Sequence, residues 1–169
     1  LLLQFNSSLT GKDIKRVLNF TGKAIVDGVN TYYRINASAA LYHLDSVPPI
    51  FLLNASNATS VKFNFSVVFN MTFNDSVNLN SYSFSWNDSG SWANASNGTF
   101  RGQQQVLSLP KNITATRGDV VGWKFHVNDS GSNKNVSVER VFTVLNTAPV
   151  VSGGDLNDSS LLSSEDVQV

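Results

Sequence analysis

The sequence predicts an all-β protein whose antiparallel strands form a β-sandwich. The first observation is the stretch 61–73, in which every odd position is apolar, the period of a strand with one buried face. The second is that about seven apolar stretches follow one another, with turn residues roughly every ten positions. The third is that no helical period separates these stretches, as expected where sheets pack on sheets.

The first 44 residues alternate weakly and predict short strands separated by turns. Thr10-Gly11-Lys12-Asp13 and Asp27-Gly28 have the composition of turns. The predicted strands are 1–5, 17–20, 24–26 and 31–37. We interpret residues 1–44 as a partial β-sandwich segment, the later strands of an incomplete domain.

Two similar proline-containing segments divide the chain. Residues 44–50 contain Pro48 and Pro49, which forbid a helix and cannot donate to a central ladder. Residues 145–151 have the same form, and the spacing between the two segments is the length of an immunoglobulin-like domain. We therefore expect a complete domain at 45–146, and at 147–169 a linker with the first strands of a further sandwich.

The longest predicted strand, 61–73, also defines the expected core. Its apolar odd positions are Val61, Phe63, Phe65, Val67, Phe69, Met71 and Phe73. The other strands expected in the central domain are 50–53, 81–86, 99–101, 105–109, 120–127 and 136–145. Two of these strands end in the same five residues, Asn-Asp-Ser-Gly-Ser, at 87–91 and 128–132, and both copies predict turns.

Several features of the central domain resemble a known family of repeats. They are the Pro-Pro opening, the aromatic strand 81–86 before a Ser-Gly turn, and the run Gly-Trp-Lys-Phe-His-Val-Asn-Asp-Ser-Gly at 122–131 before a valine-rich last strand. Together they resemble the immunoglobulin-like and fibronectin type III-like repeats of prokaryotic surface proteins, over about residues 46–146. The resemblance implies an immunoglobulin-like antiparallel β-sandwich flanked by partial sandwich segments. It implies an architecture and no particular partner, because the cysteine pair of antibody domains is absent.

Asparagine-linked glycosylation is the modification that the sequence predicts most strongly. With 20 Asn and 33 Ser plus Thr, roughly 4 Asn-x-Ser/Thr triplets are expected by chance, and the chain has fifteen. We predict a heavily glycosylated surface protein, with an Asn/Ser-rich bias of the organism as the alternative. The predicted sites are Asn6, Asn19, Asn36, Asn54, Asn57, Asn64, Asn70, Asn74, Asn87, Asn94, Asn97, Asn112, Asn128, Asn135 and Asn157.

Composition limits the cellular locations and the binding partners that we expect for the protein. Twelve basic residues balance twelve acidic ones, so nothing favours nucleic acid or an anionic membrane surface as a partner. No apolar run reaches the eighteen or so residues of a membrane span. The chain has no cysteine, whereas extracellular eukaryotic domains of this size usually carry disulfides. These observations favour an extracellular location on a prokaryotic, and specifically an archaeal, cell surface.

Residues with catalytic or metal-binding potential are few. His43 and His126 are far apart and have no metal-ligand spacing, and no nucleophile or phosphate-binding motif occurs. The acidic residues Asp88, Asp129, Asp155 and Asp158 lie in predicted turns. Asn128-Asp129-Ser130 offers oxygens to a calcium ion, but turn capping is the simpler interpretation. We therefore predict no catalytic residue, no metal site and no cofactor, and we do not expect an enzyme.

The expected function is structural. Incomplete sandwiches expose unpaired strand edges. Strands of the next copy would cover these edges in a head-to-tail array. We expect a subunit of an N-glycosylated filament, sheath or stalk, or one window of a longer tandem-repeat protein. The alternative is a carbohydrate-binding or adhesive module, in which Trp86, Trp92 and Trp123 contribute to a sugar platform. Trp123 is expected in the core, and Trp92 is the most exposed candidate.

Overall fold

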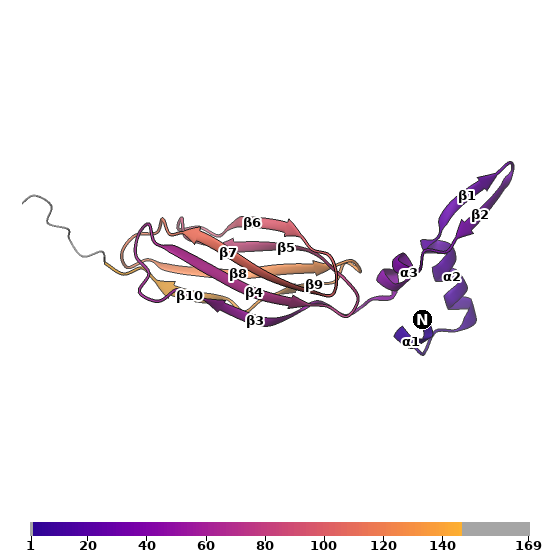
Figure 1. Cartoon of the computed structure of the whole chain (residues 1–169), viewed down its shortest axis with the longest axis horizontal. Helices are drawn as coiled ribbons and strands as arrows, with labels where there is room; N and C mark the ends of the chain where they lie inside the picture. The colour runs from indigo at the N-terminus through magenta and orange to yellow at the C-terminus, as the bar shows by residue number, and fades with distance from the viewer. Residues whose placement is uncertain (1, 147–169) are drawn as a thin grey trace, which may run out of the picture.

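The computed structural model describes residues 2–146, which form a small N-terminal head and a larger β unit (Figure 1). The head contains α1 (Leu2–Phe5), α2 (Gly11–Thr21), β1 (Lys23–Asp27), β2 (Asn30–Arg34) and α3 (Ala37–Leu44). The β unit contains β3 (Ile50–Ser56), β4 (Ser66–Asn74), β5 (Leu79–Trp86), β6 (Ala93–Thr99), β7 (Gln104–Asn112), β8 (Val120–Asp129), β9 (Lys134–Val136) and β10 (Arg140–Thr143). The chain is therefore mainly β, with antiparallel sheets, as predicted.

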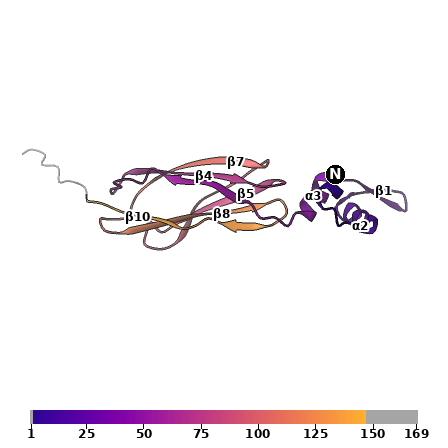
Figure 2. The same cartoon turned by 90° about the horizontal axis from the view of Figure 1, so that it is seen from below.

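Two sheets make up the β unit. One has the order β3-β4-β7, and the other has the order β10-β8-β5-β6, with β9 also paired to β8. All these pairings are antiparallel. Figure 2 shows the two layers edge-on, with β4 and β7 in one and β8 and β10 in the other. The sequential strands β4 and β5 thus lie in different layers.

The core lies between the two layers and is rich in aromatic side chains. From β4, Phe69 packs with its ring centroid 4.9 Å from that of Phe84 on β5 and 4.9 Å from that of Trp123 on β8. Phe73 lies 5.7 Å from Phe125 in the same way. All five rings are almost completely buried. The inward faces of β4, β5 and β8 therefore hold the layers together, because aromatic pairs add to the apolar area removed from water.

The strand predicted at 61–73 is shorter in the structure than the alternation suggests. β4 begins at Ser66, and its inward residues 67, 69, 71 and 73 are buried as predicted. Phe63 and Phe65, predicted as core, are 59% and 45% exposed. Asn64 has a φ of 60°, so the chain turns there instead of continuing the strand. Hydrogen bonds between residues 64–65 and Ile113 hold this turn beside the end of β7.

The last predicted strand, 136–145, is divided into β9 and β10. Both pair with the same edge of β8, but the register shifts by one residue between them. The buried Ser137 lies at this break, where its amide donates to Phe125 O and its Oγ accepts from Phe125 N. The interruption is therefore a bulge in which a side chain replaces one carbonyl of the ladder.

The other β-unit strands lie close to their predicted positions. β3, β5, β7 and β8 contain the predicted ranges 50–53, 81–86, 105–109 and 120–127. The strand predicted at 99–101 is instead β6, which ends at Thr99. The displacement follows from pairing, since β6 must lie opposite residues 81–86 of β5.

The head corrects the expectation of a partial sandwich over residues 1–44. Residues 1–5 and 17–20, predicted as strands, lie largely in α1 and within α2. The predicted turn at 10–13 is a helix start, because Thr10 and Asp13 form a reciprocal capping box. Only the strands near 24–26 and 31–37 correspond to observed strands, which form the isolated β1–β2 hairpin.

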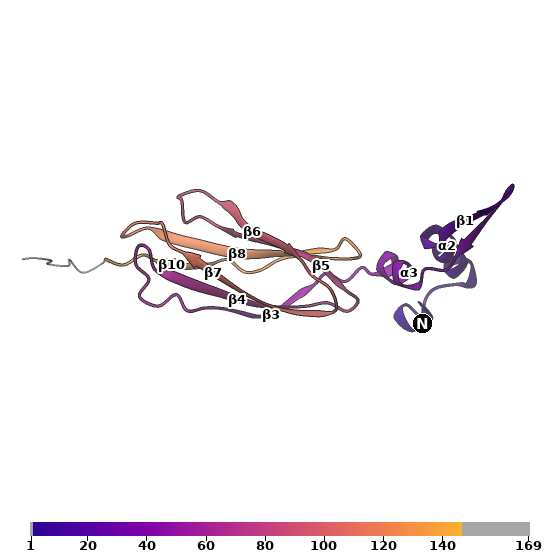
Figure 3. The ribbon, with the colours of Figure 1, turned by 45° about the horizontal axis from the view of Figure 1, so that its top comes forward.

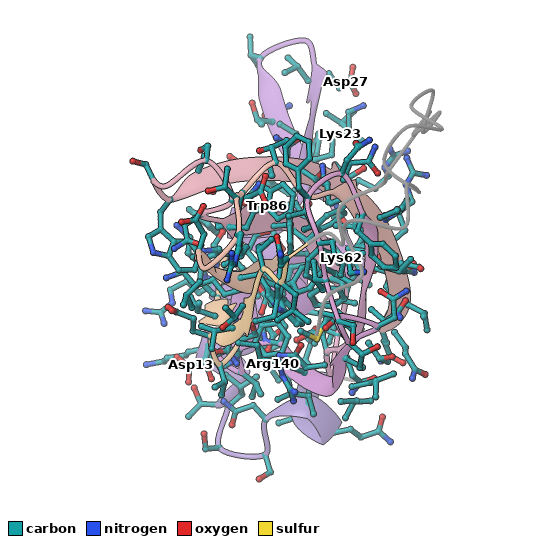
Figure 4. All side chains as sticks on the ribbon, turned by 90° about the vertical axis from the view of Figure 1, so that its left-hand side faces the viewer. Asp13, Lys23, Asp27, Lys62, Trp86 and Arg140 are labelled. Atoms are coloured by element: carbon teal, nitrogen blue, oxygen red, sulfur yellow. The ribbon has the colours of Figure 1, made fainter. Side chains whose placement is uncertain are left out.

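The hairpin leaves most of its surface uncovered. Every residue of β1 and β2 is exposed, and the hairpin pairs with no other described strand. In the view along the molecule, the hairpin that carries Lys23 and Asp27 projects beyond the outline of the β unit (Figure 4). Inside the head, only Val17 and Ala40 among the apolar residues are buried. The head therefore has a very small core of its own.

The predicted strands and donor segment at 147–169 lie outside the described residues. The chain leaves β10 toward the end of the β unit remote from the head (Figure 1). Of the helices described between residues 2 and 146, none has the length and apolar character needed to traverse a bilayer.

Candidate functional site

The predicted glycosylation sites are distributed over the head and both sheets. Fourteen of the fifteen lie within residues 2–146, and none of these fourteen is buried. The exposed ones are Asn6, Asn19, Asn36, Asn57, Asn64, Asn94, Asn97 and Asn112. The partly buried ones are Asn54, Asn70, Asn74, Asn87, Asn128 and Asn135. Asn157 lies outside the described residues.

Some of these asparagines already have structural roles. Asn87 Oδ1 accepts from the Gly122 amide at 2.6 Å, and Asn128 Oδ1 accepts from Ser81 Oγ. Asn135 Nδ2 donates to Pro49 O at 2.7 Å, which directs the nitrogen that would carry a sugar toward the chain. Exposed sites without such a bond through the nitrogen, such as Asn64 and Asn112, present less obstructed attachment points.

The three tryptophans do not form a common platform. Trp123 is buried in the core, as predicted, and Trp86 packs against Phe69 and Phe84 at its margin. Trp92 is 43% exposed. Lys124 Nζ lies 4.3 Å from the Trp92 ring centroid, a cation–π contact on the outer side of the β8 sheet. Any sugar platform in this part of the chain would therefore depend on Trp92 alone.

The two histidines are not brought together. His43 lies in the last turn of α3, with its ring centroid 5.0 Å from that of Phe20. His126 lies on β8 beside Lys124, and burial together with the Lys124 charge lowers the pKa of its imidazole. The two side chains therefore do not form a paired site.

The two Asn-Asp-Ser-Gly-Ser turns place their aspartates in different surroundings. Asp88 is buried, and its two oxygens accept four hydrogen bonds from Thr114 and Ala115. Asp129 is also buried, but it bonds only to Asn133, through Oδ1 to the backbone amide and through Oδ2 to Nδ2, each at 2.8 Å. Asp88 is thus fully occupied in joining its own turn to the loop after β7.

Asp129 has two acidic neighbours that the sequence does not place beside it. One carboxylate oxygen from each of Asp45, Asp75 and Asp129 lies within 4.8 Å of the others. Asp45 directly follows α3, Asp75 directly follows β4, and Asp129 ends β8. The three residues are 6%, 4% and 1% exposed. A buried cluster of three carboxylates thus lies where the head meets the β unit; Figure 3 shows α3 as the helix next to that end.

Two oxygens of this acidic cluster have no hydrogen-bond partner. Asp45 accepts from the Val47 amide through Oδ1, and Asp75 accepts from the Val77 and Asn78 amides through Oδ1. Asp45 Oδ2 and Asp75 Oδ2 are buried and unpartnered. Burial raises the pKa of Asp45, the Val47 hydrogen bond lowers it, and the charges of Asp75 and Asp129 raise it further.

Sequence alone points to only one member of this cluster, Asp129. The run Asn128-Asp129-Ser130 suggests a local calcium site, but the side chains of Asn128 and Ser130 form hydrogen bonds with β5 and the loop before it. Asp45 and Asp75 stand 84 and 54 positions before Asp129 in the chain, so no local spacing relates them. One feature relates the three aspartates: each stands at the end of a helix or strand.

No family model, no curated protein and no solved structure matches this chain. The functional interpretation therefore depends on the chain's own residues and geometry.

Proposed function

We propose that the β unit is an immunoglobulin-like sandwich of the fibronectin type III kind. The strand order supports this proposal: β3-β4-β7 corresponds to strands A-B-E, and β10-β8-β5-β6 corresponds to G-F-C-C′. The aromatic core between the two layers agrees with the same architecture. Such domains are common in extended surface proteins, although the fold alone does not define an activity.

The function we propose is that of a structural, non-catalytic unit of an extracellular, N-glycosylated surface filament, sheath or stalk. The observation that carries this proposal is the distribution of the predicted glycosylation sites. All fourteen sites in the described part retain some exposure, although they occur in helices, strands and turns alike. Sugars at such sites would cover the outer faces of both sheets and hinder proteases and unwanted strand pairing.

The proposed assembly is head-to-tail and modifies the expectation from sequence. The element that would accept a strand from another copy is the β1–β2 hairpin instead of a sandwich fragment, because the outer edges of the hairpin pair with no described strand. It exposes Ile25, Val26, Tyr32 and Tyr33 by 46–69%. An isolated two-stranded hairpin is marginally stable in water, so a third strand would stabilise it. Residues 147–169 of another copy, or an adjacent repeat, would supply that strand from the opposite end of the unit.

Deletion of residues 150–169 is expected to abolish concentration-dependent polymerisation, measured by light scattering and electron microscopy. Val26→Lys is expected to reduce polymer formation by at least about tenfold, since it places a charge on the acceptor hairpin, where Val26 is 69% exposed. Val138→Lys is the matched control, because Val138 is 80% exposed and lies on the β unit between β9 and β10. Polymer formation by the deletion variant at the parent's concentration would refute the proposed assembly.

Carbohydrate binding by Trp92 is a second candidate function, supported by its exposure over Lys124 in a hollow that His126 and Asn94 also line. If this function is correct, Trp92→Ala is expected to abolish binding on a glycan array, because one exposed indole would supply most of the stacking surface. Phe63→Ala removes an aromatic ring elsewhere that is even more exposed and is expected to leave binding unchanged. An array on which the parent binds no glycan would contradict this candidate.

A further inference from the structure

Beside the acidic cluster, the turn after β8 makes direct contacts with the end of α3 and the residue that follows it. Asn133 Nδ2 donates both to Asp45 O and to Asp129 Oδ2, at 3.1 and 2.8 Å. Gly131 lies so close to Tyr42 O that an added Cβ would be 3.0 Å away. The turn after β8 therefore packs directly on the end of α3, and Asp45 and Asp129 meet across this contact.

The arrangement of the three carboxylates is costly unless something compensates for their charge. Burial of an ionised carboxylate requires hydrogen bonds or an opposite charge, and like charges at this separation repel. Neither of the two ion pairs found in the described chain involves the cluster. Two of the buried oxygens also lack a hydrogen-bond donor. A bound cation would compensate for both deficits at once.

We propose that Asp45, Asp75 and Asp129 bind one Ca²⁺ ion, which ties the end of α3 to the loops at that end of the two sheets. This inference does not depend on the proposed function. The donor atoms are carboxylate oxygens, which hard divalent cations prefer and which do not favour copper or structural zinc. Opposite ligands of calcium stand about 4.6–5.2 Å apart, twice a Ca–O distance of roughly 2.3–2.6 Å, and the three oxygens lie within 4.8 Å of one another.

Calcium is favoured over magnesium because of the geometry and origin of its ligands. Three carboxylates from three different elements supply an irregular arrangement, which the flexible coordination of calcium accepts. Magnesium demands a near-ideal octahedron at about 2.0–2.1 Å, which three carboxylates fixed by separate elements are less able to supply. Water or nearby carbonyl oxygens would complete the calcium sphere.

The test uses the full chain, freed of metal with a chelator and titrated with CaCl₂ by isothermal calorimetry. We expect one site with a Kd of about 0.1–1 mM, the range of extracellular calcium modules, and at least about tenfold weaker binding of MgCl₂. In 10 mM CaCl₂ the midpoint of thermal unfolding is expected to rise by about 3–10 °C relative to EDTA. Absence of both the heat of binding and the thermal shift would overturn the proposal, and equal affinity for magnesium would overturn the assignment to calcium.

Asp45→Asn and Asp75→Asn distinguish a metal site from a merely structural cluster. Each retains the Oδ1 acceptor used by the backbone amides and removes one charge. Each is expected to weaken calcium binding at least about tenfold, yet in EDTA to unfold no lower than the parent, because repulsion within the cluster is relieved. Parent-like calcium affinity in both variants would overturn the proposal.

Asp88→Asn is the matched control for these variants. Asp88 is a buried aspartate in the other Asn-Asp-Ser-Gly-Ser turn, at the position equivalent to Asp129, but its side chain bonds to Thr114 and Ala115. It is expected to lower the unfolding midpoint in both buffers and to keep the full calcium-dependent rise. Loss of that rise in Asp88→Asn would show that the effect reflects global stability, and this too would overturn the assignment.

Discussion

Replacing Phe69 by alanine is expected to lower the free energy of unfolding by about 3–5 kcal/mol. Phe69 is fully buried on β4 and packs against rings from the opposite layer, including Trp86 at 6.0 Å and Phe142 at 6.4 Å between centroids. The substitution removes apolar contact on both sheets and leaves a cavity that rigid neighbouring rings cannot fill. Urea denaturation followed by far-ultraviolet circular dichroism measures the loss.

Phe63→Ala provides the control for the Phe69 experiment. Both phenylalanines occupy odd positions of the same alternating stretch, but Phe63 is 59% exposed in the turn before β4. Its replacement is expected to change the free energy of unfolding by no more than about 0.5 kcal/mol. Similar losses for the two variants would show that Phe63 belongs to the core face of the strand.

Replacing Asp88 by alanine is expected to cost about 2–4 kcal/mol of stability. The carboxylate accepts from Thr114 N at 2.9 Å, from Thr114 Oγ1 at 2.5 Å and from Ala115 N at 3.1 Å. Removing it leaves the amide of the buried Ala115 without a partner, in addition to the two donors of Thr114, and a buried donor keeps the full cost of desolvation. The change is measured by denaturant unfolding of the full chain.

Asp119→Ala separates this effect from ordinary turn capping. Asp119 also accepts from a threonine amide and hydroxyl, those of Thr116, at 2.7 and 2.9 Å, but it is exposed. Water can satisfy Thr116 when the carboxylate is removed, so a loss of no more than about 1 kcal/mol is expected. Equal losses in Asp88→Ala and Asp119→Ala would contradict a special role for burial at Asp88.

The wrong secondary-structure predictions for the head have identifiable physical causes. Apolar Ile14, Val17 and Leu18 follow the helical spacing of three and four, and Thr10 and Asp13 form the capping box that starts α2. A predicted strand as short as 17–20 spans too few residues to reveal this period. In α3, the alanine-rich run after the cap Asn36 favours a helix, but Asn36 was assigned to the end of a strand.

Local sequence patterns are enough to predict the β class, the inward face of residues 67–73, most strands of the β unit and the positions of the fifteen glycosylation triplets. These properties depend on neighbouring residues, since side chains alternate along a strand and a triplet is local. The residue at which β4 begins depends on strand pairing, because β4 starts opposite the end of β7. The two identical turns acquired different roles for a related reason. Asp88 meets Thr114, whereas Asp129 meets Asp45 and Asp75, and only the folded chain brings those distant residues together.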